Sequence, residues 1–250
     1  MLKKFFTLGL FLILVSGSAW AMSTQDEITI GREAAARFEQ EYGLVNDPNM
    51  QARLDRIGAR LIGQAERRDL PWQFRIVNVN EFNAAAFPGG FVYATRGLMQ
   101  GLDDDQLAFV LAHEIGHVDK RHSVRQIEGA QWTRIGLIAI VMGTSGGNLS
   151  QGSANTVALV DKVINSQHSQ QHEAEADQYG AVLMAKAGFD PVYAVAALRT
   201  LAQQGGGGTP GFLNTLLGSH PLPADRIEHA SEWVMAVPYN PPVAQPVTDR

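Results

Sequence analysis

The sequence predicts a mainly helical α+β fold with one small β-sheet that has an exposed edge strand. Most segments show helical periodicity between capping residues, whereas residues 72–95 change to the alternating pattern that is typical of strands. The chain has 250 residues, of which 45% are hydrophobic and 18% charged, a composition that supports a packed core. We therefore expect one globular domain and not a disordered or fibrous chain.

The two ends of the chain are expected to lie outside this domain. A pair of lysines precedes an apolar run at 5–15, and Ala19-Trp20-Ala21 supplies the small residues of a signal-peptidase site. The run is shorter than the roughly 20 residues that span a bilayer, which favours a cleaved signal peptide over a membrane anchor. The expected organisation is a signal peptide at 1–21, a single domain at 22–237 and a loose Pro-rich tail at 238–250.

Charge and cysteine content exclude several classes of function. Without the two leader lysines the chain has 18 basic residues against 25 acidic ones, a formal net charge of −7 in place of −5, so we expect no nucleic-acid partner. The chain has no cysteine, which excludes a disulfide framework, a thiolate metal site, a cysteine nucleophile and a lipid anchor built on a thiol. Any metal site must use His, Asp and Glu side chains.

The N-terminal half is predicted to contain two helices followed by the sheet. Thr24 and Glu27 have capping-box spacing ahead of an Ala-rich helix that stops at Gly43, and a second helix follows Asp47-Pro48. Trp72, Phe74 and Ile76 then alternate with outward positions, and residues 83–87 and 90–95 flank Pro88-Gly89. This pattern indicates a small sheet that contains a hairpin.

The C-terminal half is predicted to be helical. Asp103 and Gln106 cap a long helix with a regular apolar stripe, and further helices are expected at about 155–187, 191–204 and 223–234. The apolar run at 135–142 is too short to span a membrane, so it is a lid, a core helix or a membrane-touching patch, with lid or core favoured.

The strongest chemical signal lies in the helix that Asp103 begins. His113-Glu114-Ile115-Gly116-His117 is an H-E-x-x-H pattern, for which the composition predicts a chance match in roughly 1% of such chains. At about 100° per residue the two histidines differ by roughly 40° around the helix, so both imidazoles can reach one ion. Glu114 lies about 60° from His117, towards the apolar stripe, where a carboxylate needs a partner.

A catalytic metal site of this kind needs a third protein ligand. The metzincin pattern would place a histidine six residues after His117 with a glycine before it, but Ser123 and Lys120 occupy those positions. His122 lies roughly 140° from His117 on a continuous helix and cannot close the site.

The acidic cluster at 173–177 offers the better candidates. Glu173 and Asp177 are four residues apart and share a helix face, so one can bind the metal while the other accepts a hydrogen bond from a ligand imidazole. His172 and Glu175 point elsewhere on the same helix.

At these residues the sequence resembles the zinc metallopeptidase family of the CAAX prenyl endopeptidase and the HtpX protease. The resemblance covers about residues 26–235 and is closest to the soluble, exported bacterial branch. It implies a zincin-like core with one zinc ion per chain, in which His113, His117 and Glu173 are the ligands and Asp177 supports them. One departure is Gln170, which stands where members often carry Arg.

The chemistry and the resemblance together imply roles for further residues. Glu114 would take the proton of the attacking water and pass it to the leaving amine, while zinc polarises the peptide carbonyl. Residues Asn83, Ala84, Ala85, Ala86 and Phe87 would form the edge strand that binds an extended substrate, with the Ala85 amide as one donor. His220 and Arg226 would serve the reacting oxyanion, or His220 would occupy the open metal position as a gate.

These residues predict a zinc-dependent endopeptidase that acts on exported, most simply periplasmic, proteins. The expected partners are unfolded or extended polypeptides, with peripheral membrane contact as a further option, and the oligomeric state stays open. The main alternative is a chaperone-like binding protein whose proteolysis is weak or gated. A zinc-stabilised structural module is disfavoured, because nothing structural requires a carboxylate at Glu114.

Overall fold

A computed structural model describes residues 22–132, 160, 161, 163, 164, 168–204, 220, 224–239 and 241. The predicted signal peptide, the apolar run at 135–142 and most of the predicted tail therefore lie outside the described residues. The described residues are mainly helical with one three-stranded sheet, so the predicted α+β class is confirmed. No helix within these ranges combines the length and the apolar character needed to cross a bilayer.

The first helix, α1 (Thr24–Tyr42), has its N-cap one residue earlier than predicted. Ser23 is the N-cap, and its hydroxyl accepts a hydrogen bond from the Asp26 amide, so the predicted capping box of Thr24 and Glu27 is wrong. Glu27 is instead fully buried, and its carboxylate binds the Arg67 guanidinium at 2.7 Å. The helix ends at Gly43, as predicted.

The second helix, α2 (Pro48–Ile62), confirms both its predicted start and its predicted buried face. The Asp47 carboxylate accepts hydrogen bonds from the amides of Asn49 and Met50. The side chains at the predicted stripe, Leu54, Ile57 and Leu61, have no exposed surface.

The sheet consists of β1 (Gln73–Val77), β2 (Ala84–Phe87) and β3 (Phe91–Thr95), in the order β1-β3-β2. β1 runs parallel to β3, whereas β2 and β3 form the predicted antiparallel hairpin. Gly89 and Gly90 turn the chain with φ angles of 81° and 96°, a left-handed backbone that glycine adopts without a steric penalty. Among the described residues, β2 pairs only with β3 and is an edge strand of the sheet.

Two helices follow the sheet directly. The short α3 (Arg96–Gly101), capped by Thr95, has no counterpart in the predicted elements. The helix α4 (Asp104–Asp119) carries the predicted capping box of Asp103 and Gln106, and every residue from 107 to 119 is buried. Such burial on all sides marks α4 as the central helix of the domain.

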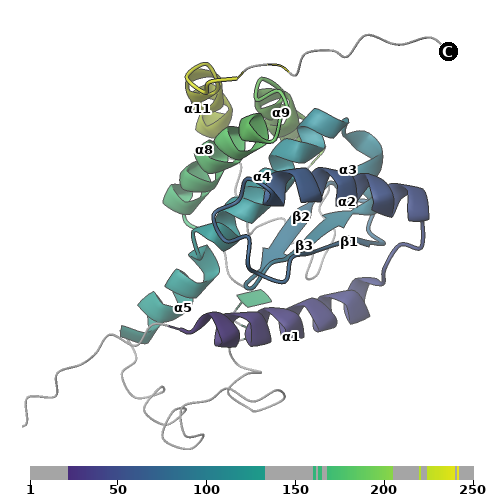
Figure 1. The fold of residues 1–250 in the computed structure, drawn as a ribbon, viewed down its shortest axis with the longest axis vertical. Helices are drawn as coiled ribbons and strands as arrows, with labels where there is room; N and C mark the ends of the chain where they lie inside the picture. Colours follow the sequence, from purple (N-terminus) through teal and green to yellow (C-terminus); the bar gives the residue numbers. More distant parts are fainter. Residues whose placement is uncertain are drawn as a thin grey trace, which may run out of the picture.

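The helices form layers around the sheet and α4 (Figure 1). One face of the sheet packs against α1, through a cluster that includes Phe38, Phe87 and Tyr93. The opposite face packs against α2 and α4, and α8 (Gln170–Lys186), α9 (Tyr193–Gln204) and α11 (Ala224–Val234) cover the far side of α4. This arrangement holds the H-E-x-x-H helix between the edge strand β2 and the acidic helix α8.

The chain between α4 and α8 differs most from the prediction. α4 ends at Asp119, Arg121 has a φ of 56°, and a separate helix α5 (His122–Trp132) then begins. The predicted helix at 155–187 contains an N-cap at Ser169, where α8 starts with the exposed Gln170. The predicted helices at 191–204 and 223–234 are present and begin at Tyr193 and Ala224.

Candidate metal centre

The two histidines of the H-E-x-x-H pattern point to the same place beside α4. Both side chains are buried, and the Nε2 atoms of His113 and His117 lie 3.0 Å apart. This geometry agrees with the prediction that histidines four residues apart on a helix can reach one ion.

Glu173 meets these two nitrogens from α8. Its Oε2 lies 3.5 Å from His113 Nε2, and its Oε1 lies 3.4 Å from His117 Nε2. His220 completes the group, because its Nδ1 lies 3.3 Å from His113 Nε2 and 3.0 Å from Glu173 Oε1. Ligands at 2.0–2.1 Å from a tetrahedral zinc ion lie about 3.3 Å from one another, so these four groups fit such an ion. Two histidines and one glutamate are also a donor set that catalytic zinc uses.

Two glycines allow α4 and α8 to approach closely enough for this meeting. A Cβ at Gly180 would lie 2.9 Å from the backbone nitrogen of His113, and a Cβ at Gly116 would lie 3.0 Å from the Tyr179 ring. A side chain at Gly180 would push the two helices apart and separate Glu173 from the histidines. Both glycines are visible in the sequence, but a glycine that allows two helices to approach closely cannot be recognised before the partner helix is known.

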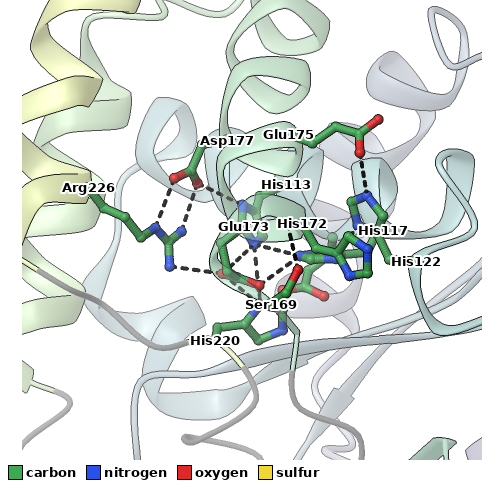
Figure 2. Close-up of polar contacts among 11 residues, drawn as sticks. His113, His117, His122, Ser169, His172, Glu173, Glu175, Asp177, His220 and Arg226 are labelled. Carbon is green, nitrogen blue, oxygen red and sulfur yellow. Dashed lines mark hydrogen bonds and ion pairs between the residues drawn. The ribbon is translucent and has the colours of Figure 1, made fainter. Parts of the chain in front are cut away.

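Asp177 supports His113, as predicted for one of the two carboxylates on that face. Its Oδ1 accepts a hydrogen bond from His113 Nδ1 at 2.8 Å. This contact fixes the proton on Nδ1 and leaves the Nε2 lone pair directed at the metal position. Figure 2 shows Asp177 behind His113, on the side away from Glu173 and His220.

Arg226 lies against both carboxylates of α8. Its Nε and Nη2 donate to Asp177 at 2.9 and 2.8 Å, and its Nη1 donates to Glu173 Oε2 at 2.9 Å. The guanidinium is buried and compensates two buried negative charges, which fixes both carboxylates in place. These contacts indicate a positioning role for Arg226, and the predicted role at the oxyanion stays a prediction.

The electrostatics of the metal-free centre reflect this crowding of charges. Burial alone lowers the pKa of His113, but hydrogen bonds to Asp177 and Glu173 raise it to about 10. Burial and the neighbouring His168 lower the pKa of His117. Burial acts to raise the pKa of Glu173, but His220 and His113 hold it far below its usual range. These opposite shifts arise because the histidines and carboxylates of the centre are packed closely together and buried.

Glu114 is buried beside the metal ligands with one carboxylate oxygen unused. Its Oε1 lies 3.5 Å from His220 Nε2, whereas its Oε2 has no hydrogen-bond partner among the described residues. A buried carboxylate oxygen without a partner costs about 1–3 kcal/mol or more, so a structural role does not account for it. The position suits a group that accepts the proton of a water.

The edge strand β2 lies beside this centre, and the register shows which of its amides face outward. The Thr95 amide donates to the Asn83 carbonyl, so in the alternating pattern of an antiparallel pair Ala85 also bonds within the sheet. The prediction that the Ala85 amide meets substrate is therefore wrong. Ala84 and Ala86 face the outer edge, and the Ala84 amide already donates to the Asn83 side chain. The outward donor is Ala86.

Further features place the predicted edge residues near the metal ligands. Ala86 and Pro88 line a small cavity together with His117. The Asn83 side chain is buried, and its Nδ2 has no hydrogen-bond partner among the described residues. Phe87 packs into the α1 side of the sheet and does not face the metal ligands.

His122 was excluded by the assumption of one continuous helix, and the structure places it next to His117. Their Nδ1 atoms lie 2.7 Å apart, on the side of His117 away from the metal position. Glu175 points away from the metal, as predicted, and its carboxylate meets His122 and Arg125. The positive φ of Arg121 redirects the chain, and no residue type in the sequence announces this break.

The carboxylate that meets the two histidines is a glutamate from a second helix, an arrangement that is typical of the gluzincin class of metallopeptidases. Residues 48–234 match peptidase family M48. The beta-barrel assembly-enhancing protease of Escherichia coli (strain K12) is 31% identical over 219 residues, which cover 84% of this chain and 44% of that protein. Metalloprotease LoiP of the same organism is 29% identical over 167 residues, 66% of this chain and 64% of that protein. Mitochondrial metalloendopeptidase OMA1 of Schizosaccharomyces pombe is 29% identical over 219 residues, 85% of this chain and 62% of that protein.

The chain belongs to peptidase family M48, which also includes the CAAX prenyl and HtpX enzymes. The predicted class, a metalloendopeptidase, is thereby confirmed. The chain spans less than half the length of the beta-barrel assembly-enhancing proteases that it matches.

Proposed function

We propose that this protein is a zinc-dependent endopeptidase that hydrolyses peptide bonds of exported or envelope proteins. The observation that carries the proposal is the unpartnered, buried Oε2 of Glu114 beside a cluster of His113, His117 and Glu173 that fits one zinc ion. Zinc supplies a Lewis acid at this place, which lowers the pKa of a water from about 15.7 to about 7 and polarises a carbonyl.

Glu114 is the group that moves the proton. Its Oε2 takes a proton from the attacking water and later delivers it to the leaving amine, since a carboxylate with no competing hydrogen bond is free to do both. Asp177 and Arg226 hold His113 and Glu173 in place during these steps, through contacts of 2.8–2.9 Å.

His220 controls the access of substrate to this centre. Its Nδ1 contacts Glu173 and its Nε2 faces Glu114, so in this conformation the ring lies across the position that a substrate carbonyl must enter. Burial acts to lower the pKa of His220, but the neighbouring carboxylates of Glu173 and Glu114 raise it. When the ring moves aside, its N–H can pair with the developing oxyanion.

An extended polypeptide is the substrate that the edge strand fits. A chain that pairs with β2 places a peptide bond next to His117, and the side-chain Nδ2 of Asn83 offers a further donor. The relatives named beta-barrel assembly-enhancing proteases suggest proteins of the bacterial envelope as the source of such chains. The predicted signal peptide at 1–21 favours an exported, most simply periplasmic, enzyme.

A chaperone-like activity is the second candidate, because His220 obstructs the centre and would make proteolysis gated or weak. Digestion of unfolded casein with and without a zinc chelator separates the two. We expect cleavage that the chelator abolishes and added zinc restores. Cleavage that is unchanged in the presence of the chelator would contradict the proposal. Suppression of casein aggregation without any cleavage would favour the chaperone-like activity.

A further inference from the structure

We infer that His122 is a positioning residue for the metal ligand His117, as the inner member of a hydrogen-bonded chain that runs through Glu175 to Arg125. We call His122, Glu175 and Arg125 the α5 relay. The inference deepens the proposed function, because it rests on His117 being a zinc ligand.

The relay is continuous from the buried centre to the surface. His122 has no exposed surface, and its Nδ1 lies 2.7 Å from His117 Nδ1. His122 Nε2 lies 3.1 Å from Glu175 Oε2, and Arg125 Nη2 donates to the same oxygen at 2.9 Å. Glu175 and Arg125 are partly exposed, so solvent reaches only the outer end. Figure 2 shows Glu175 and His122 on the side of the centre opposite to Asp177 and Arg226.

The metal position determines the direction of every hydrogen bond in the relay. His117 directs its Nε2 lone pair at the cluster, so its proton must reside on Nδ1. His117 Nδ1–H then donates to His122 Nδ1, which must carry a lone pair, and the His122 proton must reside on Nε2. That N–H donates to the Glu175 carboxylate. All three side chains can satisfy these requirements at once, with His122 neutral.

The backbone is bent to deliver His122 to this place. Arg121, with its φ of 56°, is the one residue other than glycine with a positive φ in the described part of the chain. Its guanidinium donates to Glu27 at 3.1 Å and to the Met22 carbonyl at 2.6 Å, contacts that offset a conformational cost of about 1–2 kcal/mol. On a straight continuation of α4, His122 would point away from His117.

The two metal histidines are thus supported in parallel ways. His113 donates to the Asp177 carboxylate, which Arg226 neutralises, and His117 donates through an extra imidazole to Glu175, which Arg125 neutralises. A carboxylate behind a ligand imidazole fixes its tautomer and raises its basicity, and losing such a partner costs 10- to 100-fold in metal affinity or activity.

A second metal ion bound by His117, His122 and His168 is the competing explanation of this cluster. Two nitrogens on one zinc ion lie about 3.3 Å apart, whereas the 2.7 Å between His117 and His122 is the length of a hydrogen bond. His117 would also have to bind two ions at once. The relay explains the short contact without a second ion.

The test compares His122→Asn with His122→Phe in the zinc-loaded, full-length chain. The Asn carbonyl oxygen takes the place of Nδ1 and accepts the His117 proton, whereas Phe fills the volume and preserves stacking on His172, whose ring lies 4.3 Å away, but accepts nothing. His172→Phe is the control, because His172 stacks on the relay without bonding to His117. The measurements are zinc content, the rate of zinc release to an excess of chelator, and the visible spectrum of the cobalt-substituted protein.

We expect one zinc per chain in all variants, release that is 10- to 100-fold faster in His122→Phe, and a changed cobalt spectrum in that variant only. His122→Asn should recover most of the wild-type rate, and His172→Phe should match wild type. Equal rates of zinc release in His122→Phe and wild type would overturn the relay. Equally fast release in the Phe and Asn variants would overturn it as well, because packing and not the hydrogen bond would then be the role of His122. If wild type binds a second equivalent of zinc and both His122 variants lose it, the relay is overturned in favour of the second metal site. If wild type binds no zinc, or binds it without Glu173, the proposed function fails first.

Discussion

Replacing Glu173 is predicted to remove the metal, whereas replacing Glu175, two residues away on the same helix, is predicted to retain it. The Glu173 oxygens lie 3.4 and 3.5 Å from the two ligand nitrogens, while the Glu175 carboxylate lies beyond His122. Asp177 falls between these cases, because it bonds to the ligand His113 but not to the metal position. The three carboxylates of α8 should therefore form a graded series.

The magnitudes follow from the number of ligands that each variant leaves. Structural zinc sites with four ligands bind with about 10–16 kcal/mol, so one ligand contributes about 3–4 kcal/mol, or a factor of about 100 to 1,000 in affinity. Glu173→Ala should lose affinity by that factor, and Asp177→Ala by about 10- to 100-fold. Glu175→Ala removes the outer, partly exposed member of the α5 relay and should lose less than about tenfold.

Zinc affinity measured by competition with a chromogenic chelator checks this series, with far-UV circular dichroism to confirm folding. Glu173→Gln is the matched variant, because its amide oxygen can still accept from Arg226 while the negative charge is lost. A Glu175→Ala protein that loses its zinc, or a Glu173→Ala protein that keeps it at wild-type affinity, would refute the ligand assignment.

Three further predictions concern the edge strand, the gate and acid stability. Ala86→Pro removes the outward amide of β2 and should raise KM for peptides at unchanged zinc content. Ala86→Ser keeps this amide and should leave KM unchanged. Equal KM values for the two variants would exclude this edge as the docking site. His220→Ala should raise basal activity if the ring gates the centre and lower kcat if it serves the oxyanion, with no change in either removing it from the mechanism. Burial lowers the pKa of His122 from 6.5 to about 4, so on acidification this histidine is protonated in the unfolded state before it is protonated in the folded state. The free energy of unfolding of the zinc-free protein should therefore fall by about 2 kcal/mol between pH 7 and pH 5 through this residue. Urea unfolding should show a smaller loss in His122→Asn, and an equal loss would contradict the assignment.

Most elements and the meeting of the two histidines were predictable because their signals are local. The capping box at Asp103, the stripe of Leu54, Ile57 and Leu61, and the turn at Gly89 each depend on a few neighbouring residues. The histidine pair depends only on helix geometry. We predicted that α8 meets α4 because two histidines need a third metal ligand. The family resemblance then favoured Glu173 over Asp177 as that ligand.

The parts that the sequence did not reveal depend on contacts between distant segments. The contacts of Arg226 with two α8 carboxylates were not predicted, because they arise only when α11 packs on α8. The sequence predicts that His122 points away from His117, because it does not reveal the break of the helix at Arg121. That break depends on Glu27 and on the Met22 carbonyl, about a hundred residues earlier in the chain. The substrate-facing amide was placed at Ala85 because the register of β2 against β3 cannot be read from a run of alanines.

Glu114→Gln isolates the proposed role of Glu114 as the group that moves the proton in a zinc-dependent hydrolysis. The substitution keeps size and burial but removes the base, and Glu228→Gln on the exposed surface of α11 serves as the matched control. Zinc content and casein turnover are measured on the same preparations. We expect one zinc per chain in both variants, wild-type turnover in the control, and a loss of about 10²- to 10⁴-fold in Glu114→Gln. Normal turnover in zinc-loaded Glu114→Gln would contradict this role.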